Sequence, residues 1–209
     1  MTNRAAAFDA LAPGYDEDGS HSALAETLVA GLPPAAATTA TLTVLDVATG
    51  TGAAAFAALR HLDPAHVVAV DVSEAMIDRA RESAAMADPA GRISWQRAPG
   101  IPAPAAARSV DLVLCASALH FLGRAALHDW LRVLRPGGRA AFTLTAAGYF
   151  RPSGAFAELV APDLPIPADE QQAADLALAA GFREVVARRH EVTGDRPRVV
   201  FLVYAVAPA

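Results

Sequence analysis

The residues best suited to chemistry lie around a glycine-rich turn at residues 44–52, which read VLDVATGTG. An apolar run carries Asp46 into a turn formed by Gly50 and Gly52, and the helix-forming segment AAAFAALR follows. Glycine lets the backbone turn tightly and lets a ligand approach without a Cβ in the way. Free amides at the start of the following helix add a partly positive surface. The segment therefore predicts a ligand-binding loop between a strand and a helix.

A second acidic residue, Asp71, ends the next apolar run, VVAVD. A carboxylate at this point can accept hydrogen bonds from both ribose hydroxyls of an adenosine. The spacing Gly50-x-Gly52-x-x-Ala55, followed by an acid about 20 residues later, also satisfies the dinucleotide-binding fingerprint. Asp46 favours a cationic amino-acid ligand, because a negative charge just before the loop repels a pyrophosphate. NAD binding and a purely structural loop are the alternative interpretations.

The elements around this loop predict an α/β domain, because apolar β-rich runs alternate with helical stretches as in parallel βαβ units. The expected strands are 42–47, 66–71, 92–95, 110–115 and 139–145, and the expected helices are 3–12, 21–31, 53–62, 73–87, 123–134 and 169–180. Two further strands follow, joined by the turn Thr193-Gly194-Asp195. Strands joined by so short a turn pair antiparallel. We therefore expect a mostly parallel sheet that ends in an antiparallel hairpin.

Composition excludes several classes of function. A chain of 209 residues suits one domain, and a net charge of −5 disfavours nucleic-acid binding. A signal pattern and an apolar stretch of the ~18–20 residues needed to span a bilayer are both absent. Cys115 is the one cysteine and cannot form an intramolecular disulfide. We expect a cytoplasmic protein without membrane contact, and without a metal because no His, Cys or acid cluster has ligand spacing.

Five segments in order resemble the class I, Rossmann-like S-adenosylmethionine-dependent methyltransferases that act on small molecules. They are the glycine loop, DVSEAMIDRAR, SVDLVLCASALHFL, LRVLRPGGRAAFTL and AGFREV. The resemblance covers nearly the whole chain and implies one methyltransferase domain over 1–209, with an N-terminal helical cap at 1–35 and a core at 42–206. It also implies a three-layer α/β sandwich whose seven-stranded sheet has the order 3-2-1-4-5-7-6, with the last strand antiparallel.

The resemblance implies S-adenosylmethionine as cofactor and S-adenosylhomocysteine as product. Asp46 would lie near the amino group of the methionine part, Asp71 would hold the ribose hydroxyls, and Val72 and Met76 would pack against the adenine. Tyr15 would close over the cofactor. The full set of expected cofactor residues is Tyr15, Asp46, Ala48, Thr49, Gly50, Gly52, Asp71, Val72, Met76, Gln96, Arg97, Ala98, Cys115 and Ala116.

One segment departs from the family pattern. The family usually has an acidic residue followed by Ala after the third strand, where the acid holds the adenine amino group. This chain reads ISWQRAPGIP, with Gln96, Arg97 and Ala98 in that region. A glutamine carbonyl accepts the same hydrogen bond more weakly than a carboxylate, and the amide of Ala98 would meet a ring nitrogen. The departure predicts weakened cofactor affinity.

His120 follows the fourth strand and is the candidate general base. A structural role at a family-typical turn is the alternative, and His21 is a weaker candidate. The segment CASALHF lacks the Asn-Pro-Pro-aromatic signature of amino-group methylases that act on nucleic acid and protein. The acceptor pocket is expected from residues 8–24, the segment after 116 and the loop 146–168, including Tyr149, Phe150 and Phe156.

The sequence thus predicts methyl transfer from S-adenosylmethionine to an O, N or C nucleophile of a small-molecule acceptor in secondary or specialised metabolism. The same fold could instead catalyse a cyclisation or elimination, or act as a non-catalytic partner protein. An NAD-dependent enzyme is the less favoured alternative. The sequence does not predict the acceptor or the oligomeric state.

Overall fold

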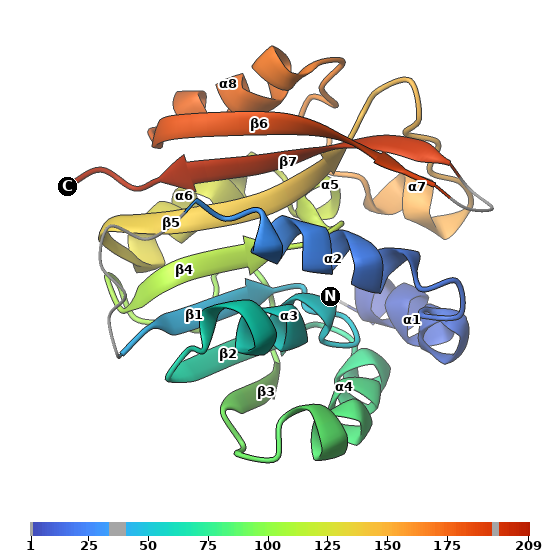
Figure 1. The fold of residues 1–209 in the computed structure, drawn as a ribbon. Coiled ribbons are helices and arrows are strands. Elements are labelled where there is room, and N and C mark those ends of the chain that lie inside the picture. Colours follow the sequence, from blue (N-terminus) through green and yellow to red (C-terminus); the bar gives the residue numbers. More distant parts are fainter. Residues whose placement is uncertain (1, 34–40, 194–196) are drawn as a thin grey trace.

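The computed structural model describes residues 2–33, 41–193 and 197–209, and Figure 1 shows one twisted sheet with helices on both faces. The strands are β1 Thr43–Val47, β2 His66–Asp71, β3 Ile93–Arg97, β4 Val110–Cys115, β5 Leu134–Thr145, β6 Arg183–Val192 and β7 Arg198–Val206. The α-helices are α1 Thr2–Leu11, α2 Ser20–Ala30, α3 Ala53–Leu62, α4 Glu74–Ala87, α5 Leu119–Leu122, α6 Arg124–Val133, α7 Ala155–Leu159 and α8 Glu170–Ala180. A short 3₁₀ helix, η1, spans Ala12–Gly14.

The sheet order is β3-β2-β1-β4-β5-β7-β6, which confirms the predicted topology. Strands β1 to β5 pair parallel with one another. Strand β7 runs antiparallel to both β5 and β6, as expected for a hairpin. The predicted turn Thr193-Gly194-Asp195 lies outside the described residues after Thr193.

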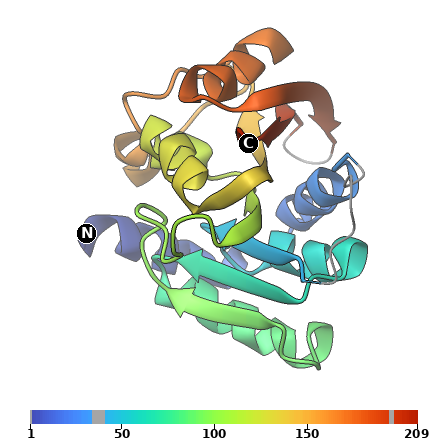
Figure 2. The same ribbon diagram turned by 90° about the vertical axis from the view of Figure 1, so that its left-hand side faces the viewer.

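The two faces of the sheet are covered by different helices (Figure 2). Apolar side chains of α2 and α3 pack on one face, and those of α6 and α8 pack on the other. Covering both faces explains why strands such as VVFLVYAV are continuous apolar runs rather than alternating ones. Polar side chains of the central strands are therefore confined to strand ends, where ligands bind in open α/β sheets.

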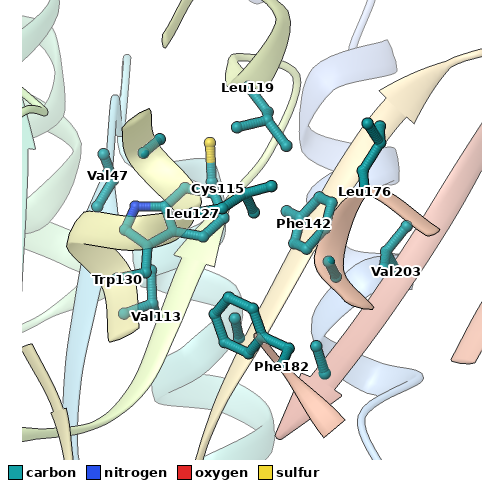
Figure 3. Close-up of a cluster of buried hydrophobic side chains, with 14 of the residues drawn as sticks. Val47, Val113, Cys115, Leu119, Leu127, Trp130, Phe142, Leu176, Phe182 and Val203 are labelled. Atoms are coloured by element: carbon teal, nitrogen blue, oxygen red, sulfur yellow. The ribbon is translucent and has the colours of Figure 1, made fainter. Parts of the chain in front are cut away.

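The core beneath α6 is centred on Trp130, whose side chain is fully buried. Its ring packs against Phe142 of β5 with ring centroids 5.5 Å apart. Figure 3 shows Leu119, Leu127 and Cys115 packed around these rings, with Phe182 and Val203 on the β7 side. This cluster fixes the carboxyl end of β4 and the short helix α5 that follows it.

Local structure differs from the prediction at four places. Strand β3 continues to Arg97, because its backbone pairs with Asp71 of β2. Strand β5 begins at Leu134, which pairs with Val110 before the register shifts and Arg139 pairs with Leu112. Helices α5 and α7 are too short for a periodic signal and lie in segments without a predicted helix. Within the part of the chain described, no helix is long and apolar enough to cross a membrane.

Candidate active site

The carboxyl ends of the parallel strands open into a cleft with a volume of about 1730 Å³. Figure 1 shows α1, α5 and α7 gathered at this end of the sheet. The lining comes from the N-terminal segment, the loops after β1, β2, β3 and β4, and the segment 145–156. Pockets for one ligand usually hold about 300–1,000 Å³, so this cleft has room for two small molecules.

The glycine loop after β1 contains two glycines with different roles. Gly50 has φ +57° and faces the cleft, where the Tyr15 ring lies 3.6 Å from the position of an added Cβ. Gly52 has φ +92°, and a Cβ there would lie 2.6 Å from the Trp95 ring. Gly52 does not line the cleft. Its requirement for glycine therefore comes from packing against β3.

Asp71 holds the loop to the start of α4. One carboxylate oxygen accepts the amide of Gly50 and the other accepts the amide of Ser73, both at 2.9 Å. Burial raises the pKa of Asp71, and these two amides oppose the rise. Each oxygen keeps a further lone pair, so two ligand hydroxyls can still be accepted. Ser73 in turn caps α4 by accepting the amide of Met76.

Asp46 is almost fully buried, at 1% exposure. Its Oδ2 accepts a hydrogen bond from the Thr49 hydroxyl at 2.5 Å, whereas Oδ1 has no partner among the described residues. Burial raises its pKa to about 7. Asp46 lines a small cavity of about 20 Å³ that shares Ala48 and Ala116 with the main cleft. A cationic ligand group would supply the missing partner and restore the ionised form.

The N-terminal segment covers the glycine loop. The rings of Tyr15 and His21 stack, with centroids 4.4 Å apart and planes within 13°. Burial raises the pKa of Tyr15 and lowers the pKa of His21, so both are neutral at physiological pH. Asp16 fixes the segment by accepting a hydrogen bond from the Thr51 hydroxyl at 2.9 Å. The structure therefore places Tyr15 over the loop, where the resemblance expected it.

The side of the cleft next to β3 contains fewer of the expected contacts. Val72, Met76, Arg97 and Ala98 line it. Gln96 lies within β3 opposite Val70 and does not line the cleft. The amide of Ala98 donates to the Asp71 carbonyl at 2.9 Å, so it is already engaged within the protein.

The other side of the cleft is aromatic around His120, which is 7% exposed. The His120 ring lies between Phe121 and Phe150, with centroid distances of 4.1 and 4.9 Å. Its Nδ1 has no partner among the described residues. Burial lowers the pKa of His120 to about 4, so the imidazole is neutral and can accept a proton or a hydrogen bond.

Most of the predicted cofactor residues therefore meet in one place. The cleft is lined by Tyr15, Ala48, Gly50, Asp71, Val72, Met76, Arg97, Ala98 and Ala116. The adjoining small cavity adds Asp46 and Thr49, whereas Gly52, Gln96 and Cys115 line neither. Cys115 is fully buried, and burial raises the pKa of its thiol, which fits an apolar packing role.

Among the lining residues that were not predicted individually, Phe8, Ser117 and Arg198 are notable. Phe8 contacts Phe121 and Phe156, and Ser117 has φ +62° with its amide held by the Thr143 hydroxyl at 2.7 Å. Arg198 begins β7, and no local motif marks it in the sequence. No group of three His, Cys, Asp or Glu side chains suited to a metal occurs in the described parts of the chain.

Comparison with known proteins agrees with this geometry. A family model described as a methyltransferase domain matches residues 44–138. The ubiquinone/menaquinone biosynthesis C-methyltransferase UbiE of Geobacter sulfurreducens is 41% identical over 100 residues, which are 46% of this chain and 39% of that protein. A S-adenosylmethionine-dependent methyltransferase structure from Aquifex aeolicus superposes with a TM-score of 0.58 and 26% identity, covering 79% of this chain and 81% of that one. In sequence over residues 44–138 and in fold, the chain is thus similar to S-adenosylmethionine-dependent methyltransferases.

The chain also has the fold of a Haloferax volcanii protein described as a methyltransferase, solved in complex with the Trm112 methyltransferase activator. The TM-score is 0.72 at 20% identity, and the match covers 97% of this chain and 98% of that one. The chain spans about two fifths of the length of the Geobacter relative. The family match includes the glycine loop and therefore favours the methyltransferase interpretation of that loop over the dinucleotide one.

Proposed function

We propose that this protein transfers the methyl group of S-adenosylmethionine to a small-molecule acceptor. One observation carries the proposal: Asp46 and His120 each bury a polar atom that has no hydrogen-bond partner in the described part of the chain, the first beside the glycine loop and the second on the aromatic side of the cleft. Buried polar atoms are normally hydrogen-bonded. The amino group of a bound amino-acid moiety would donate a hydrogen bond to Oδ1 of Asp46, and a hydroxyl or amine of the acceptor would donate one to Nδ1 of His120.

The residues beside the glycine loop fit the cofactor. Asp71 would accept the ribose hydroxyls, Met76 and Val72 would offer an apolar surface to the adenine, and the Asp46 carboxylate would pair with the amino group. When bound, the cofactor supplies a methyl group already activated on a sulfonium. The chain's own contribution is therefore alignment and exclusion of water, which the stacked rings of Tyr15 and His21 provide over the loop.

The aromatic side fits a modest organic acceptor of secondary or specialised metabolism. His120 is neutral and can take the proton of a hydroxyl or carbon acid at Nδ1 as the methyl group is transferred. The relative from Geobacter is named a C-methyltransferase of quinone biosynthesis. That name supports an apolar ring as the acceptor body, methylated at carbon or at a ring oxygen.

One feature favours a second candidate, a non-catalytic partner protein. The β3 side has no carboxylate for the adenine amino group, and the Ala98 amide is already engaged. Weak adenine recognition would suit a protein that kept the fold after losing tight cofactor binding.

Calorimetric titration with S-adenosylhomocysteine separates these candidates. We expect saturable binding that raises the melting temperature, with no shift from NAD or NADP. Absence of S-adenosylhomocysteine binding would overturn the proposal in favour of the partner protein. A methyl-transfer assay over ring-bearing acceptors then separates methylation from cyclisation or elimination, which would consume cofactor without methylating the acceptor.

The role of His120 has its own test once an acceptor is found. His120→Phe keeps a ring between Phe121 and Phe150 but removes the proton acceptor. General-base catalysis contributes about 10²–10⁴-fold, so we expect kcat to fall at least about a hundredfold with little change in S-adenosylhomocysteine affinity. The exposed His128 on α6 gives a matched control, His128→Phe, which should keep full activity.

A further inference from the structure

Arg198 is a cation of the cleft that forms no direct ion pair within the described residues. Its guanidinium lines the cleft, and within the described chain its one hydrogen bond goes to the Ser20 hydroxyl at a long 3.4 Å. No carboxylate lies within ion-pair distance of it in residues 2–33, 41–193 and 197–209. A partly buried charge is stabilised when it is paired. The arrangement therefore calls for an anionic partner.

The strand order places Arg198 away from the glycine loop. Strands β4 and β5 separate β7 from β1, and adjacent strands lie about 4.8 Å apart, so the start of β7 is roughly 14 Å across the sheet from the loop. The amide of Ala146 donates to the Val199 carbonyl, which ties the start of β7 to the segment that carries Phe150. Arg198 thus lies where the segment that carries Phe150, on the aromatic side, meets Ser20 of the N-terminal segment.

The wall on that side is apolar. The rings of Phe8, Phe121 and Phe156 form a triangle with centroid distances of 5.5 to 6.2 Å. His120 and Phe150 extend this wall toward the centre of the cleft. A flat apolar body fits such a surface, since aromatic rings pack on one another at these distances.

The other charged groups of this side are already engaged or lie at the rim. Arg4 donates to the Phe121 carbonyl at 2.8 Å, and Arg151 donates to the Ala147 carbonyl at 3.1 Å. Glu17 and Asp18 line the rim, where both are exposed, and Asp18 accepts the amide of Ser20. Arg198 is thus the cation best placed to bind a ligand anion inside the cleft.

We propose that the acceptor is an organic acid, with an apolar ring against the phenylalanine wall and a carboxylate paired with Arg198. The proposal rests on the proposed function, because it treats the aromatic side as the acceptor site. A guanidinium fork matches a carboxylate with two parallel hydrogen bonds, which gives orientation as well as affinity. The pairing would fix which ring position faces the methyl group.

The test is calorimetric titration of the protein saturated with S-adenosylhomocysteine. The probes are 4-hydroxybenzoate and 4-hydroxyphenylacetate, each compared with its neutral amide. Charge-assisted hydrogen bonds contribute enough that we expect each acid to bind about tenfold more tightly than its amide. We expect Arg198→Gln to abolish this preference. Arg183→Gln is the matched control, because Arg183 is exposed at the opposite end of the hairpin and should keep the preference.

Several results would overturn the proposal. They are equal binding of acid and amide, no binding of either acid, or an undiminished preference in a folded Arg198→Gln protein. If Arg198→Gln instead lowers the affinity for S-adenosylhomocysteine, Arg198 binds the carboxylate of the cofactor, and the proposal is also overturned. Failure of the proposed function looks different: S-adenosylhomocysteine would not bind the wild-type protein, while the acids would still bind the free protein through Arg198.

Discussion

The two sides of the cleft consist of different chemical groups. The side next to β1 and β2, here called the cofactor side, consists of backbone amides and the buried carboxylates Asp46 and Asp71. The aromatic side consists of rings and an arginine that come from α1, α5, α7 and β7. The cofactor side comes from two consecutive strand–loop–helix units, whereas the aromatic side depends on segments far apart in the sequence that only the complete fold brings together.

Burial also shifts the pKa values of Asp46 on the cofactor side and of His120 on the aromatic side in opposite directions. It raises the pKa of Asp46 to about 7 and lowers the pKa of His120 to about 4, because the neutral form is favoured in each case. The folded state thus binds more protons at Asp46 than the unfolded state, so stability falls as pH rises from about 4 to 7. It binds fewer protons at His120, so stability rises from about pH 4 to 6.5.

The largest expected effect is a loss of cofactor affinity from a substitution on the cofactor side alone. Asp71→Asn removes the charge that accepts two backbone amides and two ribose hydroxyls. We expect S-adenosylhomocysteine affinity to fall on the order of a hundredfold or more, because the lost charge-assisted hydrogen bonds contribute about 2–4 kcal/mol. Titration calorimetry measures the change.

Asp88 provides a matched control for this substitution. It is also a buried carboxylate that accepts two backbone amides, those of Arg92 and Ile93, but it lies outside the cleft. Asp88→Asn should destabilise the fold about as much as Asp71→Asn does, but it should leave the affinity for S-adenosylhomocysteine unchanged. Equal affinity losses in both variants would mean that Asp71 acts on the fold and not on the ribose.

The second prediction uses the opposite pH dependences. In the wild-type protein without ligand, the contributions of Asp46 and His120 to stability partly cancel between pH 4 and 6.5. In Asp46→Asn only His120 contributes, so the stability should rise with pH. In His120→Phe only Asp46 contributes, so the stability should fall with pH. Each change should be on the order of 2 kcal/mol over this range. Denaturant unfolding at a series of pH values measures both slopes. The same slope in both variants would show that one of the two groups is not neutral when buried.

These contrasts also explain how far the sequence could be interpreted. Asp46, Gly50 and Asp71 could be proposed from the sequence because a strand, a glycine turn and a strand-ending acid lie within one stretch of it. The sheet order followed from the family resemblance, and the antiparallel hairpin from its short turn. Arg198 could not be found, because its nearness to Ser20 arises only when β7 inserts between β5 and β6. Gln96 was misplaced because β3 runs two residues beyond its apolar run, so pairing with β2 decided where the loop begins.

The third prediction sharpens the role of Asp46. A carboxyl with a pKa of about 7 is half protonated at pH 7, and a cationic amino group beside it favours the ionised form. S-adenosylhomocysteine binding should therefore release about half a proton at pH 7, and its affinity should rise between pH 6 and 8. Titrations in buffers of different ionisation enthalpy measure the release. Asp46→Asn should abolish the release and weaken binding about tenfold, whereas an unchanged release would place the amino group elsewhere.

The smallest expected effect concerns the β3 side, where Gln96 and Arg97 occupy the place of the family's acid. The structure separates the two positions: Arg97 lines the cleft, is 60% exposed and lies 3.7 Å from Glu74, whereas Gln96 does not line the cleft. Arg97→Asp should tighten S-adenosylhomocysteine binding about fivefold, since a carboxylate accepting from the adenine amino group contributes roughly 1 kcal/mol. Loss of the exposed pair with Glu74 should cost little stability. Gln96→Asp is the matched control and should leave the affinity unchanged. If the folded Arg97→Asp protein binds no more tightly, adenine recognition rests on packing against Met76 and Val72, and the cofactor side ends at Asp71.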